Sequence, residues 1–106
     1  MVACKLLIST ASSRDEAQTI AQALVDARLA ACVNILGPID SIYRWKGEVE
    51  QAQEFLMMIK TTADRFIAVR DRLRELHSYE TPELIQLPIE NGLPDYLAWI
   101  AESVKE

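Results

Sequence analysis

Residues 31–61 read ACVNILGPIDSIYRWKGEVEQAQEFLMMIKT, and this stretch decides the fold. Two segments rich in apolar residues, 31–45 and 48–61, flank the pair Lys46-Gly47. Gly47 can adopt the positive φ that a tight turn requires, so the pattern predicts a β-hairpin. Each arm would have roughly fourteen residues, whereas strands of small sheets usually have about five or six. The hairpin should therefore project beyond the sheet to which it belongs.

A projecting two-stranded ribbon is marginally stable in water unless another surface covers it. This ribbon carries large apolar side chains, namely Ile39, Ile42, Tyr43, Trp45 and Val49. Partner subunits are the simplest cover for such a surface. The sequence therefore predicts self-association, with Tyr43 and Trp45 at the interface between subunits.

The segment before the hairpin predicts one strand and one helix. Residues 3–10 form a short apolar run typical of a buried strand. Ser13 and Glu16 have the spacing of a capping box, in which the hydroxyl and the carboxylate each bond to the other residue's backbone N–H. The helix that follows is expected to bury a stripe of apolar residues, namely Ala17, Ile20, Ala21, Leu24 and Val25.

The segment after the hairpin predicts a helix, a strand and a last helix. A helix from about residue 61 to His77 would bury Phe66, Val69, Leu73 and Leu76. Residues 83–87 suit a strand that Pro88 places at a sheet edge or ends. Pro94 suits the first turn of a C-terminal helix whose apolar residues are Leu97, Ile100, Ala101 and Val104.

The resulting order of elements is β-α-β-β-α-β-α. It predicts a single α+β domain over residues 1–106, a ferredoxin-like βαββαβ sandwich with a long hairpin between its second and third strands and an added C-terminal helix. That plan occurs in enzymes, RNA-binding proteins, metal carriers and signalling trimers. The fold alone therefore does not decide the function.

Charge and composition narrow the classes of partner. Eleven Lys and Arg residues against sixteen Asp and Glu residues give a net charge of −5, the wrong sign for binding nucleic acid. No run approaches the roughly 18 apolar residues of a membrane helix, and the N-terminus lacks the apolar segment of a signal peptide. We therefore expect no membrane insertion and a cytoplasmic location. Cys4 and Cys32 are expected to be reduced, buried thiols, and no CxxC spacing supports a zinc or redox site.

Five blocks of the chain, in this order, resemble the CutA family, known as divalent-cation tolerance proteins. They are AACVNI at 30–35, SIYRWKGE at 41–48, IKTT at 59–62, YETPE at 79–83 and DYLAW at 95–99. The resemblance covers nearly the whole chain. It implies a homotrimer similar in architecture to PII signalling proteins, with long hairpins joining sheets across subunits. It also implies an association with copper and other divalent cations, and since no catalytic mechanism carries over, no enzyme is expected.

The single histidine, His77, is the candidate metal ligand, because a neutral imidazole binds copper and zinc. The alternative is that His77 only ends the second helix, where a partly charged imidazole favours the helix dipole. Members of the CutA family that are associated with copper carry a cysteine in the first strand and paired histidines at the position of His77. This chain has Ser9 and Leu76 at the matching positions, so His77 alone carries over.

A further set of residues is the candidate lining of a ligand-binding cleft between subunits: Cys32, Lys60, Thr61, Tyr79, Thr81 and Glu83. If the loop around Tyr79 lies beside the strand that carries Lys60, the ammonium group could pair with Glu83 or face an anionic ligand. The alternative is ordinary turn chemistry, because Pro82 forces an extended backbone at Thr81. Cys32 could equally be a small buried thiol.

Two functions follow as expectations. The first is a cytoplasmic, homotrimeric protein of divalent-cation tolerance that binds copper or another divalent cation weakly through His77 and nearby oxygen ligands. The second is a PII-like signalling module that holds a small anionic ligand in the cleft between subunits. Since only a ligand of the folded form raises the melting temperature, added metal and added nucleotide should distinguish them.

Overall fold

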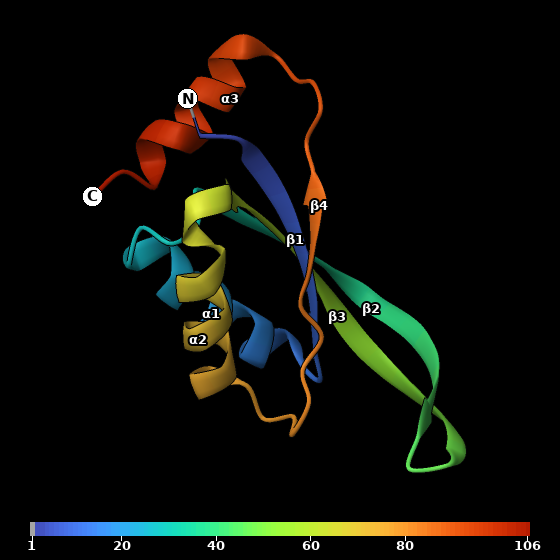
Figure 1. Cartoon of the computed structure of the whole chain (residues 1–106). Coiled ribbons are helices and arrows are strands. Elements are labelled where there is room, and N and C mark those ends of the chain that lie inside the picture. Colours follow the sequence, from blue (N-terminus) through green and yellow to red (C-terminus); the bar gives the residue numbers. More distant parts are fainter. Residues whose placement is uncertain (1) are drawn as a thin grey trace.

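The computed structural model describes residues 2–106, which form one four-stranded antiparallel sheet and three α-helices (Figure 1). The elements are β1 (Cys4–Ala11), α1 (Arg14–Asp26), β2 (Cys32–Trp45), β3 (Glu48–Thr62), a 3-10 turn (Ala63–Arg65), α2 (Phe66–Leu76), β4 (Ile85–Pro88) and α3 (Pro94–Ser103). The strands lie in the order β2-β3-β1-β4. The predicted α+β, ferredoxin-like fold with its C-terminal helix is confirmed.

The core lies between the sheet and the two helices α1 and α2, which cover the same face of the sheet (Figure 1). Its fully buried large side chains come from β1, β3 and both helices: Leu7, Ile20, Leu24, Met57, Ile59, Val69 and Leu73. Burial of each contributes roughly 1.5–3 kcal/mol to folding. Val25 was expected in this core but is 39 % exposed. It lies at the margin of the buried stripe of α1, one residue before the helix ends at Asp26.

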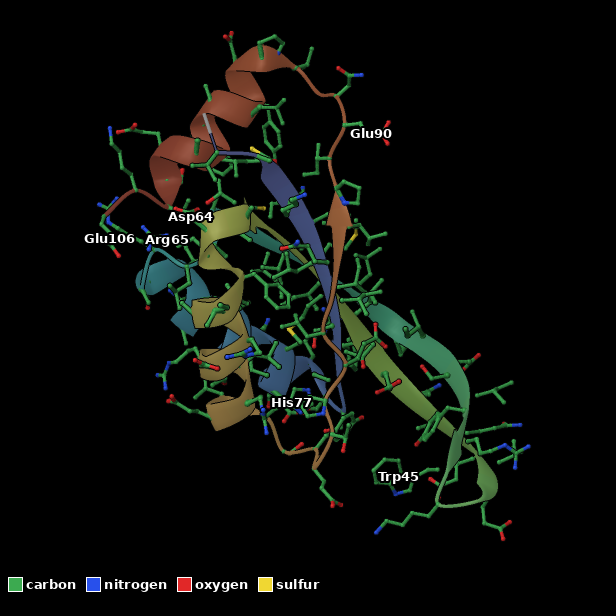
Figure 2. The ribbon with its side chains drawn as sticks, viewed as in Figure 1. Trp45, Asp64, Arg65, His77, Glu90 and Glu106 are labelled. Atoms are coloured by element: carbon green, nitrogen blue, oxygen red, sulfur yellow. The ribbon has the colours of Figure 1, made fainter. Side chains whose placement is uncertain are left out.

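α3 lies across the end of the sheet where β1 begins (Figure 1). Within α3, the side chain of Ile100 is fully buried, and Pro94 occupies the first turn as predicted. The guanidinium group of Arg65 donates two hydrogen bonds to the carbonyl of Val104, at 3.0 and 2.6 Å. It also pairs with Glu106 at 2.9 Å (Figure 2). These contacts attach the C-terminal segment to the start of α2.

The sheet face opposite α1 and α2 carries apolar side chains that are exposed or only half-buried. We call this surface the open sheet face; it comprises Ile8, Leu36, Leu56, Met58, Ile85 and Leu87. Residues directly opposite in the register share one face, as Ile8 does with Met58 and with Ile85. α3 reaches only the far end of this face, near Cys4 and Lys60. An uncovered apolar surface of this kind marks a site of protein association.

The hairpin is as long as the sequence predicts, with 14 residues in β2 and 15 in β3. β1 pairs with β3 only as far as Phe55, so the rest of the hairpin extends away from the sheet (Figure 1). The chain consequently measures 44 Å along its longest axis and 25 and 21 Å along the others. Gly47 has the expected positive φ of 82° at the turn. A register shift between Leu36 and Ile39 falls where Gly37-Pro38 interrupts the pattern.

β4 is a short edge strand that starts two residues later than predicted. The carbonyl of Glu83 accepts a hydrogen bond from the Ser9 hydroxyl at 2.6 Å instead of joining a strand ladder. Pro88 ends the strand at the edge, where its missing N–H has no cost. In the described part of the chain, no helix has the length and apolar character needed to cross a membrane.

Candidate functional site

The loop between α2 and β4, residues 77–84, holds four of the predicted site residues. His77 follows the last residue of α2, and its side chain is fully buried (Figure 2). Its Nε2 atom lies 2.7 Å from the carbonyl oxygen of Thr10, and its Nδ1 atom lies 3.1 Å from the backbone N of Tyr79. Because a carbonyl only accepts and a backbone N–H only donates, these partners assign the proton to Nε2 and the lone pair to Nδ1. His77 is thus a neutral imidazole.

This geometry bears directly on His77 as a metal ligand. A metal ion binds the lone pair of a neutral ring nitrogen. In His77 that lone pair already accepts the Tyr79 N–H, and the other nitrogen donates to Thr10. The arrangement favours the alternative interpretation, a structural residue at the end of α2, and does not support strong ligation by His77. Among residues 2–106, no three His, Cys, Asp or Glu side chains form a group that could hold a metal ion.

Glu16 connects α1 to the same loop. One carboxylate oxygen accepts hydrogen bonds from the backbone N–H and the hydroxyl of Ser12, at 3.1 and 3.0 Å. The other accepts the Ser78 N–H at 2.8 Å and lies 3.8 Å from Nδ1 of His77. Partial burial raises the pKa of Glu16, but the hydrogen bonds from Ser78 and Ser12 outweigh it and lower this pKa to about 2.

Of the two hydrogen bonds of the predicted capping box, one is confirmed and the other is wrong. The Ser13 hydroxyl accepts the Glu16 N–H at 3.1 Å, as the spacing predicts. The Glu16 carboxylate, however, does not return to the backbone of Ser13. It bonds to Ser12 and to Ser78, which lies 62 residues away in the sequence. The helix cap therefore also serves as a tertiary contact.

Replacing Glu16 by Gln is expected to lower the free energy of unfolding by about 1–2 kcal/mol at pH 7, because an amide accepts fewer hydrogen bonds and loses the charge. A pKa lowered by folding stabilises the protein above the ordinary value of 4.5 and loses that effect as the pH falls toward about 2. The difference between wild type and variant should therefore shrink between pH 5 and pH 3. Urea unfolding at fixed protein concentration measures it.

Asp15→Asn is the matched control for this substitution, since Asp15 is an exposed carboxylate in the same helical turn. We expect that control to change stability by no more than a few tenths of a kcal/mol. A loss equal to that of Glu16→Gln, or a loss independent of pH, would contradict the assigned role of Glu16.

Tyr79 joins the loop to the base of the hairpin. Its hydroxyl donates a 2.8 Å hydrogen bond to the carboxylate of Glu54, which is only 8 % exposed on β3. Burial, followed by the hydrogen bond and the charge of Glu54, holds the pKa of Tyr79 far above its ordinary value. Partial burial and the same carboxylate also raise the pKa of Glu83. Two carboxylates and a phenol thus share one corner of the subunit.

The other predicted cleft residues lie elsewhere in the subunit. Thr61 is fully buried and donates to the carbonyl of Leu29 at 2.7 Å. The ammonium group of Lys60 lies 5.6 Å from the centre of the Tyr96 ring. The thiol of Cys32 lies 3.7 Å from the amide oxygen of Asn34. Cys32 and Lys60 are direct partners in the register of β2 and β3.

Within one subunit, the loop residues around Glu83 and the strand residues around Lys60 do not come together. Lys60 is opposite Leu6 on β1, whereas Glu83 bonds to Ser9, three residues further along that strand. Three residues of a strand span about 10 Å, and β1 also lies between Lys60 and Glu83, so of the two alternatives for Lys60 the pairing with Glu83 does not occur within the chain. Thr81 lines a cavity against α2. A cleft that unites the two groups across a subunit boundary stays a prediction.

The two cysteines are free, as predicted. Cys4 lies on β1 and Cys32 on β2, and β3 runs between them. Strands at either side of a third are about 10 Å apart, which is beyond the reach of a disulfide. Both thiols are half-buried rather than fully buried, and partial burial raises the pKa of Cys4.

Tyr43 and Trp45 lie on the projecting part of the hairpin, with Trp45 at the end of β2 (Figure 2). Their exposed fractions are 39 % and 37 %, and their neighbours Ile42 and Val49 are 69 % and 62 % exposed. Glu50 faces the Tyr43 hydroxyl, and the Lys46 ammonium lies 5.6 Å from the Trp45 ring. More than a third of each aromatic side chain stays exposed, and this part is free to pack against another molecule.

Comparison with known proteins assigns this fold and these motifs to a family. Residues 5–103 match the family model described as CutA1 divalent ion tolerance protein. The chain is 46% identical over 99 residues to the divalent-cation tolerance protein CutA of Thermus thermophilus, covering 93% of this chain and 96% of that protein. It is 48% identical over 96 residues to the CutA of Archaeoglobus fulgidus, covering 91% and 93%.

Solved structures agree with the sequence comparison. The CutA1 structure from Thermus thermophilus superimposes with a TM-score of 0.92 at 46% identity, covering 94% of this chain and 97% of that one. A CutA from Archaeoglobus fulgidus, described as periplasmic, gives 0.93 at 45% identity, covering 96% and 99%. With a family model that spans most of the sequence and relatives this similar along their whole length, the chain belongs to the CutA1 divalent ion tolerance protein family.

Proposed function

We propose that this chain acts in tolerance to divalent cations as a homotrimer. The names of its relatives support the role in cation tolerance, since they are called divalent-cation tolerance proteins and match along nearly their whole length. The proposed assembly rests on the open sheet face and the long hairpin. Both are apolar surfaces that a single subunit leaves uncovered.

The two surfaces are suited to a closed ring of subunits. The hairpin projects from one end of the sheet, so its tip extends beyond the compact body that the sheet and helices form (Figure 1). The open sheet face of one copy and the hairpin of the next can then cover each other, and a rotation that closes leaves no copy with a free surface. Three copies are the number that the resemblance to PII-like trimers implies.

We further propose that the trimer contacts copper or another divalent cation weakly, and that its role is binding rather than catalysis. The engaged ring nitrogens of His77 argue against the imidazole as the ligand, because an ion would have to displace either the Tyr79 N–H or the Thr10 carbonyl, so the proposed weak contact rests on oxygen ligands. The cytoplasmic location expected from the sequence stays part of this proposal, and the free cysteines Cys4 and Cys32 are compatible with it. Fractionation of the host cell tests that location.

We expect copper(II) to bind the purified, tag-free trimer with a dissociation constant weaker than about 10 μM, and His77→Gln to change it by less than about twofold. Gln can replace one of the hydrogen bonds of the imidazole without offering a nitrogen lone pair. Native mass spectrometry with copper(II), zinc(II) and manganese(II) measures uptake. Stoichiometric copper that is lost on substitution would make His77 a strong ligand and contradict this assignment.

A small anionic ligand in a cleft between subunits is the second candidate function. Lys60 favours it, because none of the ion pairs among the described residues includes this ammonium group. Melting temperatures measured with added metal and with added nucleotide distinguish the two candidates. A rise in melting temperature with the nucleotide, abolished by Lys60→Gln, would favour the anion site over cation binding.

A further inference from the structure

A cavity of about 350 Å³ lies on the helical side of the subunit, between α2 and the loop that precedes β4. It is separate from the open sheet face and from the corner around Glu54. Its lining consists of Phe66, Arg70, Leu73, Arg74, Glu80, Thr81, Pro82 and Leu84. The volume is at the lower end of the range of cavities that hold small organic molecules, about 300–1,000 Å³.

The lining combines an apolar floor with a charged rim. Phe66, Leu73 and Leu84 supply hydrocarbon from α2 and from the loop. Arg70 and Arg74 stand one helical turn apart, so their guanidinium groups lie on the same side of α2. Arg70 pairs with Asp71 at 3.0 Å. Arg74 takes part in none of the ion pairs found within residues 2–106.

These charges define the class of ligand. Two like charges at this spacing destabilise an isolated helix, and an anion seated between them removes that repulsion. Guanidinium groups bind planar carboxylates by paired hydrogen bonds. Glu80 on the rim and Asp71, which pairs with Arg70, offset two positive charges, so the unpaired Arg74 can hold one negative charge but not the several charges of a polyphosphate. The Thr81 hydroxyl adds a group that can donate or accept.

We propose that this cavity binds a small organic monocarboxylate, whose carboxylate meets Arg74 beside Arg70 and whose apolar body covers the half-buried Phe66 and Leu84. The proposal is independent of cation tolerance, because none of these residues belongs to the open sheet face or the hairpin and none of their side chains is a hydrogen-bond partner of the His77 imidazole. It also gives a second role to the predicted site residue Thr81, which lines the cavity instead of meeting Lys60.

Titration of the ¹⁵N-labelled, assembled protein with phenylacetate tests the proposal by the backbone amide resonances. We expect saturable shifts confined to residues 66–84, with a dissociation constant of about 1 mM, a typical value for a ligand of this size. Inorganic phosphate, which lacks the apolar body, and phenethylammonium, which reverses the charge, should bind at least about fivefold more weakly. Equal shifts with all three probes would overturn the proposal.

Two variants of α2 make a matched pair. Arg74→Gln should weaken phenylacetate binding by about fivefold or more, since it removes the unpaired guanidinium and keeps a good helix former. Arg72→Gln lies on the same helix outside the cavity, where Arg72 pairs with Glu75 at 2.9 Å. It should leave the affinity unchanged within about twofold. Identical affinities in wild type and Arg74→Gln, or no saturable shift, would refute the site.

Discussion

Replacing Met58 by Lys is expected to convert the proposed trimer into folded monomers. Met58 is half-buried at the centre of the open sheet face, on the central strand β3. In a separate subunit the long Lys side chain can reach water, so the fold should lose little stability. In an assembly the same ammonium would be buried against apolar side chains of a partner, at a cost of several kcal/mol at each interface. This cost arises at every interface between subunits, so the assembly should dissociate.

Light scattering coupled to gel filtration at about 10 μM measures the mass, and circular dichroism checks the fold. Gln18→Lys is the matched control, because it places the same charge on the exposed side of α1, on the other layer of the subunit. Ile85→Lys repeats the test on the edge strand β4, where the side chain is 51 % exposed. If both Lys variants of the sheet remain trimers, the open sheet face is not the interface.

Replacing Trp45 by Ala is expected to weaken assembly by about 2–4 kcal/mol, the range for a buried aromatic anchor. Trp45 ends β2 at the tip of the hairpin, and 37 % of its surface is exposed in the single chain. The Lys46 ammonium lies 5.6 Å from the centre of its ring, and the exposed part of the side chain is available to a partner subunit. The effect should therefore appear in the subunit equilibrium and not in the fold of the subunit.

Analytical ultracentrifugation over a dilution series measures this change as a shift of the dissociation midpoint. Ile67→Ala is the control, since Ile67 is a large apolar residue, 62 % exposed, on the helical layer. It should leave the midpoint unchanged. A Trp45→Ala variant that dissociates like wild type would mean that the hairpin tip is exposed to solvent in the assembled protein.

The features that the sequence predicted correctly are those with local causes. The hairpin follows from an apolar pattern and from the positive φ of Gly47, and the start of α1 follows from the Ser13 hydroxyl and an amide three residues on. Pro94 likewise marks the start of α3. In each case the deciding atoms lie within one turn of the chain, so the residue types suffice.

The partners of the candidate site residues were not predictable, because they come from distant parts of the chain. His77 bonds to Thr10, 67 residues earlier, and Glu16 bonds to Ser78, 62 residues later. Lys60 and Glu83 were candidates for a pair only if the loop around Tyr79 lay beside the strand that carries Lys60, and it does not. In the order β2-β3-β1-β4, strand β1 lies between them, and an offset of three residues along β1 separates them further. Register along neighbouring strands depends on packing that spacing does not encode.

The open sheet face was also beyond the reach of the sequence. β1 reads CKLLISTA, which is apolar on both of its faces. Alternation therefore does not tell which face the helices cover. Only the structure separates Leu7, which is fully buried beneath the helices, from Ile8, which points to the uncovered side.

Native mass spectrometry of the purified, tag-free protein tests most directly whether the open sheet face and the hairpin build a homotrimer. At about 1 μM subunit we expect one dominant species with three times the mass of the chain, which Met58→Lys reduces to a single chain mass. A wild-type protein that is monomeric under these conditions would contradict the assembly. It would also show that the long hairpin is stable without a partner.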